Sequence, residues 1–212
     1  MRVTYIIILI NIIVFIAQIA IPPFTNVFAL DPQMALNGAY WQFVTYMFLH
    51  AFEDIHGNLY LTHIAINLFV LLIFGAVVER EIGRDSYIAL YILSGIGSAF
   101  LHLGLTTLQM GFLGDIGLIG ASGAVFGVIA VYGLLFPKNW IIIFPGIPMP
   151  AIVAVIAIAG FELISGIIGL FPGIASFGHL GGIIVGIFFI VYWKYIKKQK
   201  KAYHGDFEFL WR

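Results

Sequence analysis

The stretch Gly-Ala-Ser-Gly-Ala-Val-Phe-Gly at residues 120–127 places a serine among small neighbours, at the start of the apolar run Val125–Phe136. Taken alone, Ser122 is explained by packing, because small residues line the contacts between transmembrane helices. The spacing of Gly123 and Gly127 fits that interpretation. The alternative is that Ser122 is a nucleophile, and this depends on which other residues the chain brings to the same depth.

The composition is that of a polytopic membrane protein. Of the 212 residues, 62% are hydrophobic and 9% are charged, and the mean hydropathy is +1.07. A soluble domain has about 25% charged residues, and a water-soluble core of this size could not bury so much apolar surface. The formal net charge of zero excludes the basic footprint of a nucleic-acid-binding protein. The absence of cysteine excludes disulfides, a thiol nucleophile and a cysteine-ligated metal.

Six apolar segments have the length of about 20 residues that crosses roughly 30 Å of hydrocarbon. They cover residues 4–22, 60–78, 86–107, 118–136, 149–170 and 176–196. We therefore predict an all-α bundle of six transmembrane helices over residues 1–196, followed by a short basic and aromatic tail at 197–212. The first segment lacks a convincing small-residue cleavage site, so it is interpreted as a helix rather than as a removed signal peptide.

The basic residues predict the orientation of this bundle. With six spans, all ten Lys and Arg residues lie on the side that carries both termini and the loops at 79–85 and 137–148. The positive-inside rule then places both termini in the cytoplasm, and we expect a multi-pass protein of a prokaryotic plasma membrane. The long aromatic loop at 23–59 lies outside. We expect it partly in the outer leaflet as short helices, either as an interfacial anchor or as a surface that shapes access to the bundle.

Four polar residues within the predicted helices share one depth near the outer face. His63 and Asn67 are spaced i, i+4 in the outer half of the second helix, and Ser122 and His179 lie near the outer ends of the fourth and sixth. Polar groups at membrane depth are costly and are functional candidates. Separately, His179 fits a structural histidine and Asn67 an interhelical hydrogen bond. Together the four supply a nucleophile, a base and donors for an oxyanion.

These residues stand in motifs that resemble those of one family. Residues 120–127 resemble the serine motif of rhomboid intramembrane proteases, and His-Ile-Ala-Ile-Asn at 63–67 resembles their HxxxN segment. Gly-His-Leu-Gly-Gly at 178–182, with Gly186, resembles their histidine and glycine motif. The resemblance starts at the first-loop segment Trp-Gln-Phe-Val-Thr at 41–45, where the family often has Arg in place of Gln.

The resemblance implies a six-helix core with a Ser–His dyad that cuts transmembrane segments of other membrane proteins within the lipid bilayer, without a cofactor or metal. It assigns Ser122 as nucleophile and His179 as general base and then acid. It assigns His63, Asn67 and the Ser122 backbone N–H to stabilisation of the oxyanion. It also implies a water-filled cavity open to the outside and access for substrate between the second and fifth helices. The residues expected to pack this site are Gly120, Gly123, Phe126 and Gly182.

The residue types fit that assignment. Glycines 178, 182 and 186 of the sixth helix have the spacing that lets another helix approach closely. The natural partner is the fourth helix with Gly123 and Gly127, which would bring His179 within reach of Ser122. Phe126, where the family often has Tyr, could stack on the His179 ring.

Several alternatives stay open. His50 and His56 suggest an incomplete metal site or, as we favour, a surface loop, and His102 is interpreted as structural. Glu162 in the fifth helix is interpreted as a structural hydrogen-bond partner, with gating as the minority view. The alternative function is a non-catalytic rhomboid-like protein that binds transmembrane helices, although such relatives are expected to lack the serine or histidine. A small transporter is disfavoured, because we find no internal repeat.

Overall fold

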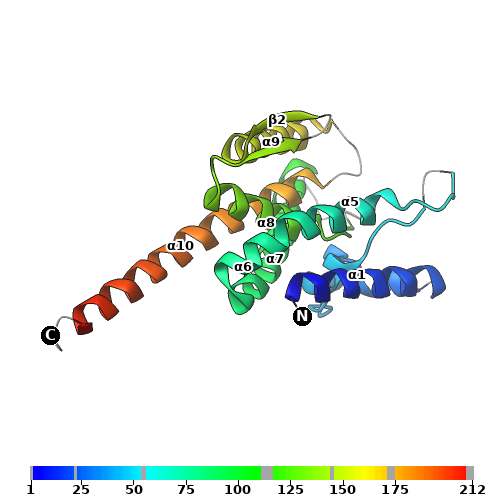
Figure 1. Ribbon diagram of the computed structural model, residues 1–212. Coiled ribbons are helices and arrows are strands. Elements are labelled where there is room, and N and C mark those ends of the chain that lie inside the picture. The colour runs from blue at the N-terminus through cyan, green and yellow to red at the C-terminus, as the bar shows by residue number, and fades with distance from the viewer. Residues whose placement is uncertain are drawn as a thin grey trace.

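The chain forms a helical membrane bundle, which confirms the predicted all-α polytopic fold. The computed structural model describes residues 2–21, 23–53, 56–110, 117–143, 146–170 and 175–208 (Figure 1). In these ranges, five helical spans are long and apolar enough to cross a membrane. They are α1 (Val3–Ala20), the continuous span Thr62–Ile82, α7 (Arg84–Met110), α9 (Ala151–Ile168) and α10 (Ser176–Glu208). The span Thr62–Ile82 consists of α5 (Thr62–Val70), the π-helical turn η2 (Leu71–Gly75) and α6 (Ala76–Ile82).

The sixth helix, α8 (Ser122–Leu135), is shorter than the predicted segment 118–136. Its 14 residues extend about 21 Å at 1.5 Å per residue, which is less than the roughly 30 Å of hydrocarbon. Four residues before Ser122 that were predicted to be helical are not in α8, so the expected span is corrected at its N-terminal end. Eight of the 14 residues of α8 are buried, which makes it a central helix of the bundle.

The residues before α8 are extended because they bind the first loop instead. Leu118 and Leu30 exchange two backbone hydrogen bonds of 3.0 Å, and the N–H of Gly120 donates to the Tyr46 carbonyl at 3.0 Å. Gly120 has a φ of +124°, a conformation that favours glycine. This turn redirects the chain into α8, so that Ser122 is the first residue of the helix.

The first loop consists of short helices, as expected from its aromatic content. They are α2 (Phe24–Phe28), α3 (Pro32–Leu36), α4 (Gln42–Thr45) and the 3₁₀ turn η1 (Tyr46–Phe48). Asp31 caps α3 by accepting from the Met34 N–H at 2.8 Å. Tyr46 is buried and its hydroxyl donates to the Gly95 carbonyl on α7 at 2.7 Å. The loop is therefore docked on the bundle and covers the N-terminal end of α8.

Small residues bring α7, α8 and α10 into close contact at the centre of the bundle. A Cβ placed on Gly182 would collide with the backbone carbonyl of Gly123, and one on Gly186 would lie 2.5 Å from the carbonyl oxygen of Gly127. Gly123 and Gly127 of α8 also face Ser98 and Ser94 of α7. No larger side chain fits between these backbones, so glycine fixes the distance between α8 and α10.

The carboxylate of Glu79 holds the N-terminus of α1 on α6. Its Oε1 accepts from the Val3 N–H at 2.7 Å, and its Oε2 accepts from the Thr4 N–H at 2.9 Å and the Thr4 hydroxyl at 2.6 Å. The first N–H groups of a helix have no intrahelical partner and favour a negative charge. Glu79 therefore supplies the cap that Arg2, at the N-cap position, does not provide.

The antiparallel hairpin β1 (Trp140–Ile143) and β2 (Ile147–Pro150) connects α8 to α9. It adds a small sheet that the sequence did not predict. Helix α9 lies at the edge of the bundle in Figure 1, while α10 extends beyond it to Glu208, past the predicted start of the tail at residue 197. Residues 209–212 of that tail lie outside the described residues.

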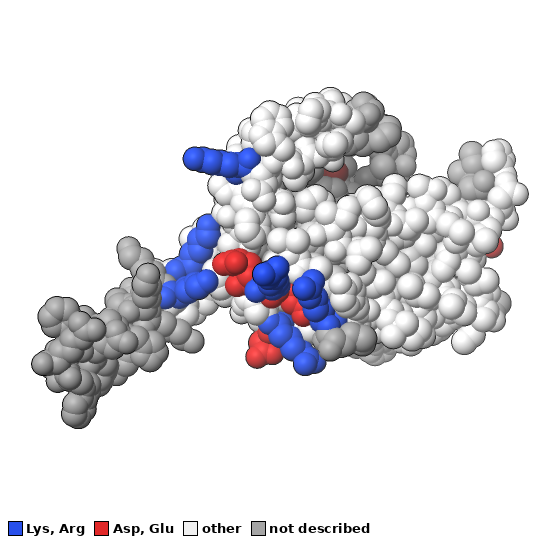
Figure 2. Space-filling model, viewed as in Figure 1, with Lys and Arg blue, Asp and Glu red and all other residues white. Residues whose placement is uncertain are grey.

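Basic side chains gather at one end of the molecule. On the face shown in Figure 2, they surround the end of α6, the start of α7 and the part of α10 that leaves the bundle. Lys197 lies 3.7 Å from Glu81 and over the ring of Trp193 at this end. The opposite end of this face, where α5 begins, shows no Lys or Arg among the coloured residues. The charge distribution is thus asymmetric along the bundle.

Candidate active site

Ser122 and His179 meet although 57 positions separate them in the sequence. Ser122 Oγ lies 2.8 Å from His179 Nε2, a hydrogen-bond distance. Ser122 is the first residue of α8, and His179 is in the first turn of α10, where its N–H donates to the Ala175 carbonyl at 3.0 Å. The glycine contacts between α8 and α10 bring these two helix starts together. A serine with a histidine base at this distance can act as a nucleophile.

Phe126 holds the plane of the His179 ring. It lies one turn after Ser122 on α8, and its ring stacks on the imidazole with a centroid distance of 4.3 Å and an interplanar angle of 18°. This contact restrains rotation of the imidazole about its side-chain bonds. The Nε2 atom therefore stays directed at Ser122 without a hydroxyl at position 126.

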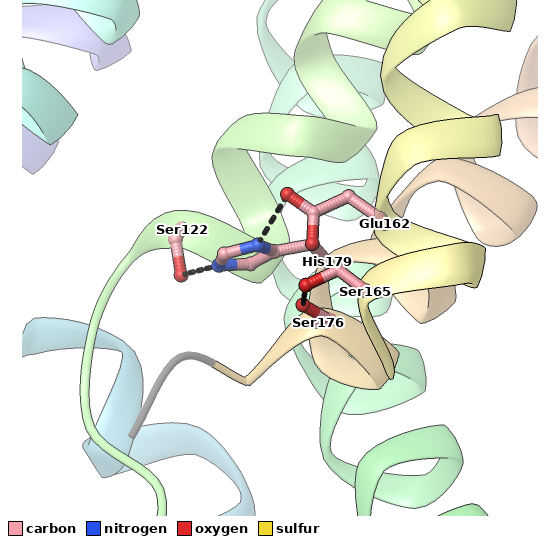
Figure 3. A network of polar contacts seen from close by, with 5 residues as sticks. All are labelled: Ser122, Glu162, Ser165, Ser176 and His179. Atoms are coloured by element: carbon pink, nitrogen blue, oxygen red, sulfur yellow. Dashed lines mark hydrogen bonds and ion pairs between the residues drawn. The ribbon is translucent and has the colours of Figure 1, made fainter. Parts of the chain in front are cut away.

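Glu162 of α9 approaches the other nitrogen of the same ring (Figure 3). Its Oε1 lies 3.1 Å from His179 Nδ1, and the two side chains are 9% and 13% exposed, respectively. The two atoms are within ion-pair distance, but they do not form a well-aligned hydrogen bond. The sequence indicated a costly carboxylate in the fifth helix, but the facing residue on α10 could be found only from the structure.

A second polar contact joins α9 and α10 beside the first. Ser176 Oγ and Ser165 Oγ lie 3.2 Å apart in a buried position. Ser165 is three residues after Glu162, and Ser176 is three residues before His179 (Figure 3). The two pairs therefore follow one antiparallel register, so the position of Glu162 opposite His179 results from the helix packing.

His63 faces the turn that precedes Ser122. A Cβ placed on Gly120 would lie 2.9 Å from His63 Nε2 and 3.7 Å from Ser122 Oγ, so Gly120 leaves room for the ring as well as adopting its positive φ. The Ala51 N–H donates to His63 Nδ1 at 3.1 Å. Because Nδ1 is the acceptor, the proton of a neutral ring is on Nε2. His63 thus presents an N–H donor beside Ser122.

Asn67 is buried one turn further along α5, where its Nδ2 donates to the His63 carbonyl at 2.9 Å. Among the hydrogen bonds of the described residues, none joins Asn67 to Ser122 or His179. The amide group has two N–H donors, and this bond uses one of them. The structure therefore brings together Ser122, His179, His63 and Phe126, with Asn67 behind them.

His50 is buried rather than in a surface loop, which corrects the favoured interpretation. Gln18 accepts from the His50 N–H at 2.9 Å and donates to its carbonyl at 3.2 Å. The ring packs edge-on against His63 with centroids 5.0 Å apart. Burial lowers the pKa of His50 to about 3, and the neighbouring His63 adds to this effect. His50 is therefore neutral at pH 7 and supports the ring beside the site.

The described residues hold no group of three or more His, Cys, Asp or Glu side chains that could bind a metal ion. The side chains gathered at the site differ in their chemistry. Ser122 provides a hydroxyl, His179 a base and His63 a donor, and Glu162 lies behind the base. Such a set can carry out acyl transfer, in which serine attacks a carbonyl carbon and donors stabilise the resulting oxyanion.

The sequence matches the Rhomboid domain family over residues 37–195. The chain belongs to the rhomboid family, and it is an integral membrane protein with the helical fold of that family.

Named relatives include proteases. The chain is 31% identical over 172 residues to the rhomboid protease AarA of Providencia stuartii, covering 73% of this chain and 56% of that protein. It is 32% identical over 148 residues to rhomboid-type serine protease 2 of Emericella nidulans, covering 70% and 26%. RHOMBOID-like protein 6, mitochondrial, of Arabidopsis thaliana is 28% identical over 159 residues, covering 74% and 45%. The matched region thus spans between about a quarter and just over half of each relative.

Proposed function

We propose that this chain is an intramembrane serine endopeptidase that cuts transmembrane segments of other membrane proteins with a Ser122–His179 dyad. The observation that carries the proposal is the 2.8 Å distance between Ser122 Oγ and His179 Nε2. The two residues come from helix starts inside a membrane-spanning bundle, which is where a transmembrane substrate would be met. The similarity to named rhomboid proteases supports the same reaction class.

Acylation begins when Ser122 Oγ attacks the carbonyl carbon of the scissile peptide bond. Its proton passes to His179 Nε2, and the carbonyl π electrons move to the oxygen. His179 then protonates the leaving amine nitrogen as the C–N bond breaks. Water attacks the resulting ester and gives a proton to His179, which returns it to Ser122 Oγ as the C–O bond breaks. Water is the only further reactant.

Three groups are assigned to the oxyanion. The Nε2–H of His63 faces the turn at Gly120, beside Ser122 Oγ. The N–H of Ser122 is at the N-terminus of α8, where backbone donors lack intrahelical partners and the helix dipole favours negative charge. The second N–H of the Asn67 amide is the third donor. Loss of one such donor from an oxyanion site typically lowers the rate about 10²- to 10³-fold.

The proposed topology has six spans over residues 1–196 and a tail at 197–212, with both termini in the cytoplasm of a prokaryotic cell. The gathering of basic side chains at one end of the molecule supports this orientation (Figure 2). The dyad then lies toward the outer face of the plasma membrane. A substrate helix must unwind locally there, because its carbonyl groups are otherwise hydrogen-bonded, so helix-weakening residues near the outer interface are the expected preference.

The alternative is a rhomboid-like protein that binds transmembrane helices without cutting them. The dyad distance favours the protease, since a binding protein has no need for a serine directed at a histidine. The two functions are separated by whether the Ser122 hydroxyl is activated.

Labelling of the detergent-solubilised protein with a fluorophosphonate tests this activation. Wild type is expected to react, and Ser122→Ala and His179→Ala are expected to lose the reaction. Ser165→Ala is a matched control, because it removes a serine hydroxyl from the same part of the bundle and should retain labelling.

Labelling that persists in Ser122→Ala would contradict the proposal. A folded wild type that neither reacts nor cuts a transmembrane reporter protein would support the binding protein instead. Size-exclusion chromatography and thermal unfolding of each variant confirm that a loss of labelling is not a loss of fold.

A further inference from the structure

We propose that Glu162 is a positioning residue for His179, so that the site is a Ser–His–Glu triad rather than a dyad. The inference rests on the proposed function and concerns the same site. In this arrangement Glu162 orients the imidazole, selects its tautomer and stabilises the imidazolium that forms during acylation. It does not take up the proton.

The contacts place one group on each nitrogen of the ring. Ser122 Oγ lies 2.8 Å from Nε2, and Glu162 Oε1 lies 3.1 Å from Nδ1. A neutral imidazole carries its proton on one nitrogen only, and the partner of each nitrogen decides which one. A carboxylate beside Nδ1 favours the proton there, which leaves the Nε2 lone pair free to accept the Ser122 proton. This is the tautomer that a general base requires.

The helix register places Glu162 at this position. Ser165 and Ser176 form the neighbouring contact of α9 with α10 at 3.2 Å. A Cβ on Gly166 would lie 2.6 Å from the Phe177 ring, so glycine lets α9 approach α10 beside this pair. Both contacts lie on one side of the Glu162–His179 pair, toward the end of α9 and the start of α10, and they hold the carboxylate in register with His179.

Burial makes a partner for Glu162 necessary. Its residue is 7% exposed, and its Oε2 has no hydrogen-bond partner in the described part of the chain. An ionised carboxylate at membrane depth is costly unless it is paired. The partner within reach is His179, whose charge during the reaction is positive.

The other titratable groups around His179 do not replace Glu162. His63 of α5 and His102 of α7 are close enough to interact electrostatically with the His179 ring. Both are bases, so neither stabilises a positive charge on His179. Phe126 of α8 covers one face of the ring. Among the described groups that face His179, the stabilising charge comes from Glu162.

In the acylation step, the Ser122 O–H bond breaks as the bond from Oγ to the carbonyl carbon forms, and the proton moves to His179 Nε2. The ring then carries one positive charge, with the Nδ1–H directed at the Glu162 carboxylate. Catalytic contacts in free enzymes are often imperfectly aligned and tighten in the complex, which fits the geometry of this ion pair. When His179 passes its proton to the leaving amine, the ring and the carboxylate return to their starting charges.

The test measures the rate of fluorophosphonate reaction as a function of pH for wild type, Glu162→Gln, Glu162→Asp and the control Glu81→Gln. Glu162→Gln is expected to slow the reaction about 10- to 1,000-fold, since removal of an orienting carboxylate affects the base itself. The loss should fall on the limiting rate at saturating probe, not on probe binding. Glu162→Asp keeps the charge and should react at an intermediate rate. Glu81→Gln makes the same exchange in an exposed ion pair with Lys197 and should stay within about twofold of wild type, because such pairs contribute little.

The pH dependence separates a charge effect from a loss of packing. Without the carboxylate the imidazolium is less stable, so Glu162→Gln should change the acidic limb of the rate profile, and Glu81→Gln should leave it as in wild type. A wild-type rate with an unchanged acidic limb in Glu162→Gln would overturn the triad. Equal losses in Glu162→Gln and Glu81→Gln, or an Asp variant no faster than Gln, would also overturn it.

Failure of the triad is distinct from failure of the proposed function. If wild type reacts in a Ser122-dependent way while Glu162→Gln is unaffected, the protease stands as a dyad. If folded wild type neither reacts nor cuts a transmembrane reporter protein, both proposals fail. A measurement on the unmutated side chain covers the case in which Glu162→Gln does not fold. Nitrogen-15 NMR of labelled histidine, assigned with His179→Ala, should show the neutral ring protonated on Nδ1, and protonation on Nε2 would overturn the proposal.

Discussion

Helices α8 and α9 each bring one partner to His179, but they are held in the bundle in different ways. Eight of the 14 residues of α8 are buried, and its glycines meet the backbone of α10. Only five of the 18 residues of α9 are buried, and the rest of its surface is mostly apolar and exposed. Ser122, the proposed nucleophile, is thus held by close backbone contacts between α8 and α10, whereas the carboxylate of Glu162 depends on a few side-chain contacts of a largely exposed helix.

The largest effect is expected where the backbones of α8 and α10 meet. In Gly182→Ala, the new Cβ would collide with the Gly123 carbonyl, and backbone cannot rotate away as a side chain can. We expect a loss at or above the upper end of the about 1–3 kcal/mol that overpacking typically costs, together with the loss of fluorophosphonate labelling. Thermal unfolding in detergent measures the first and gel fluorescence the second.

Gly160→Ala on α9 is the matched control for that change. A Cβ on Gly160 would meet no atom within 4 Å, and alanine is the better helix former by about 1 kcal/mol. This variant is expected to be as stable as wild type or slightly more so. Similar stabilities of Gly182→Ala and Gly160→Ala would contradict the difference between α8 and α9, because they would show that the contact of α8 with α10 is not more tightly packed than the surface of α9.

A smaller loss of stability is expected at α1, a second peripheral helix, whose N-terminus is bound by Glu79. Glu79→Ala removes the acceptor for the N–H groups of Val3 and Thr4 and for the Thr4 hydroxyl. The expected cost is about 2–3 kcal/mol of unfolding free energy, since a helix cap and hydrogen bonds to a charged group are lost together. Fluorophosphonate reactivity of the folded fraction should be unchanged, because α1 does not contribute to the dyad.

Glu81→Ala is the control for Glu79→Ala. Its carboxylate forms an exposed ion pair with Lys197, and such pairs contribute about 0–1 kcal/mol. Equal destabilisation by the two variants would exclude Glu79 as the specific cap of α1.

The smallest effect concerns the loop that covers the start of α8, and it depends on pH. Burial lowers the pKa of His50 from 6.5 to about 3. Between these values the unfolded chain binds a proton that the folded chain does not, so stability is complete above about pH 6.5 and falls as the pH decreases toward 3. From pH 7 to pH 5 the loss from this group is on the order of 2 kcal/mol.

His50→Gln removes that titration and should flatten the fall in melting temperature between pH 7 and pH 5. Wild type and the variant share the other histidines, so the difference between their pH profiles gives the contribution of His50. An identical pH dependence in the two proteins would mean that His50 takes up its proton without leaving its buried position.

Apolar spans could be read from the sequence because each must cross the same thickness of hydrocarbon. This constraint located the helices that carry His63, Glu162 and His179 and placed the polar residues at a shared depth. It did not fix where α8 begins, because residues 118–120 satisfy the same hydropathy but bind Leu30 and Tyr46 of the first loop. A contact between segments about 70–90 positions apart leaves no local signal.

The same reasoning explains what was missed around the candidate site. Glu162 was evident as a costly carboxylate, but its position opposite His179 depends on the register of α9 against α10, which hydropathy does not determine. His50 was assigned to a surface loop because loops are usually solvated, whereas Gln18 satisfies its backbone groups inside the bundle. In both cases the missing information was a tertiary contact rather than the chemical character of the residue.

The short length of α8 determines how deep Ser122 would lie in the membrane. In the proposed orientation, the C-terminal end of α8 lies at the cytoplasmic boundary of the membrane, where Lys194 donates to the Leu134 carbonyl at 2.8 Å. A helix of 14 residues reaches about 21 Å from that boundary, which leaves about 9 Å of a roughly 30 Å hydrocarbon layer above Ser122. A substrate helix would therefore be cut about six residues inside its outer end, a position that mass spectrometry of the two fragments measures directly. Shifting a reporter's hydrophobic segment by one residue should shift the cut by one residue.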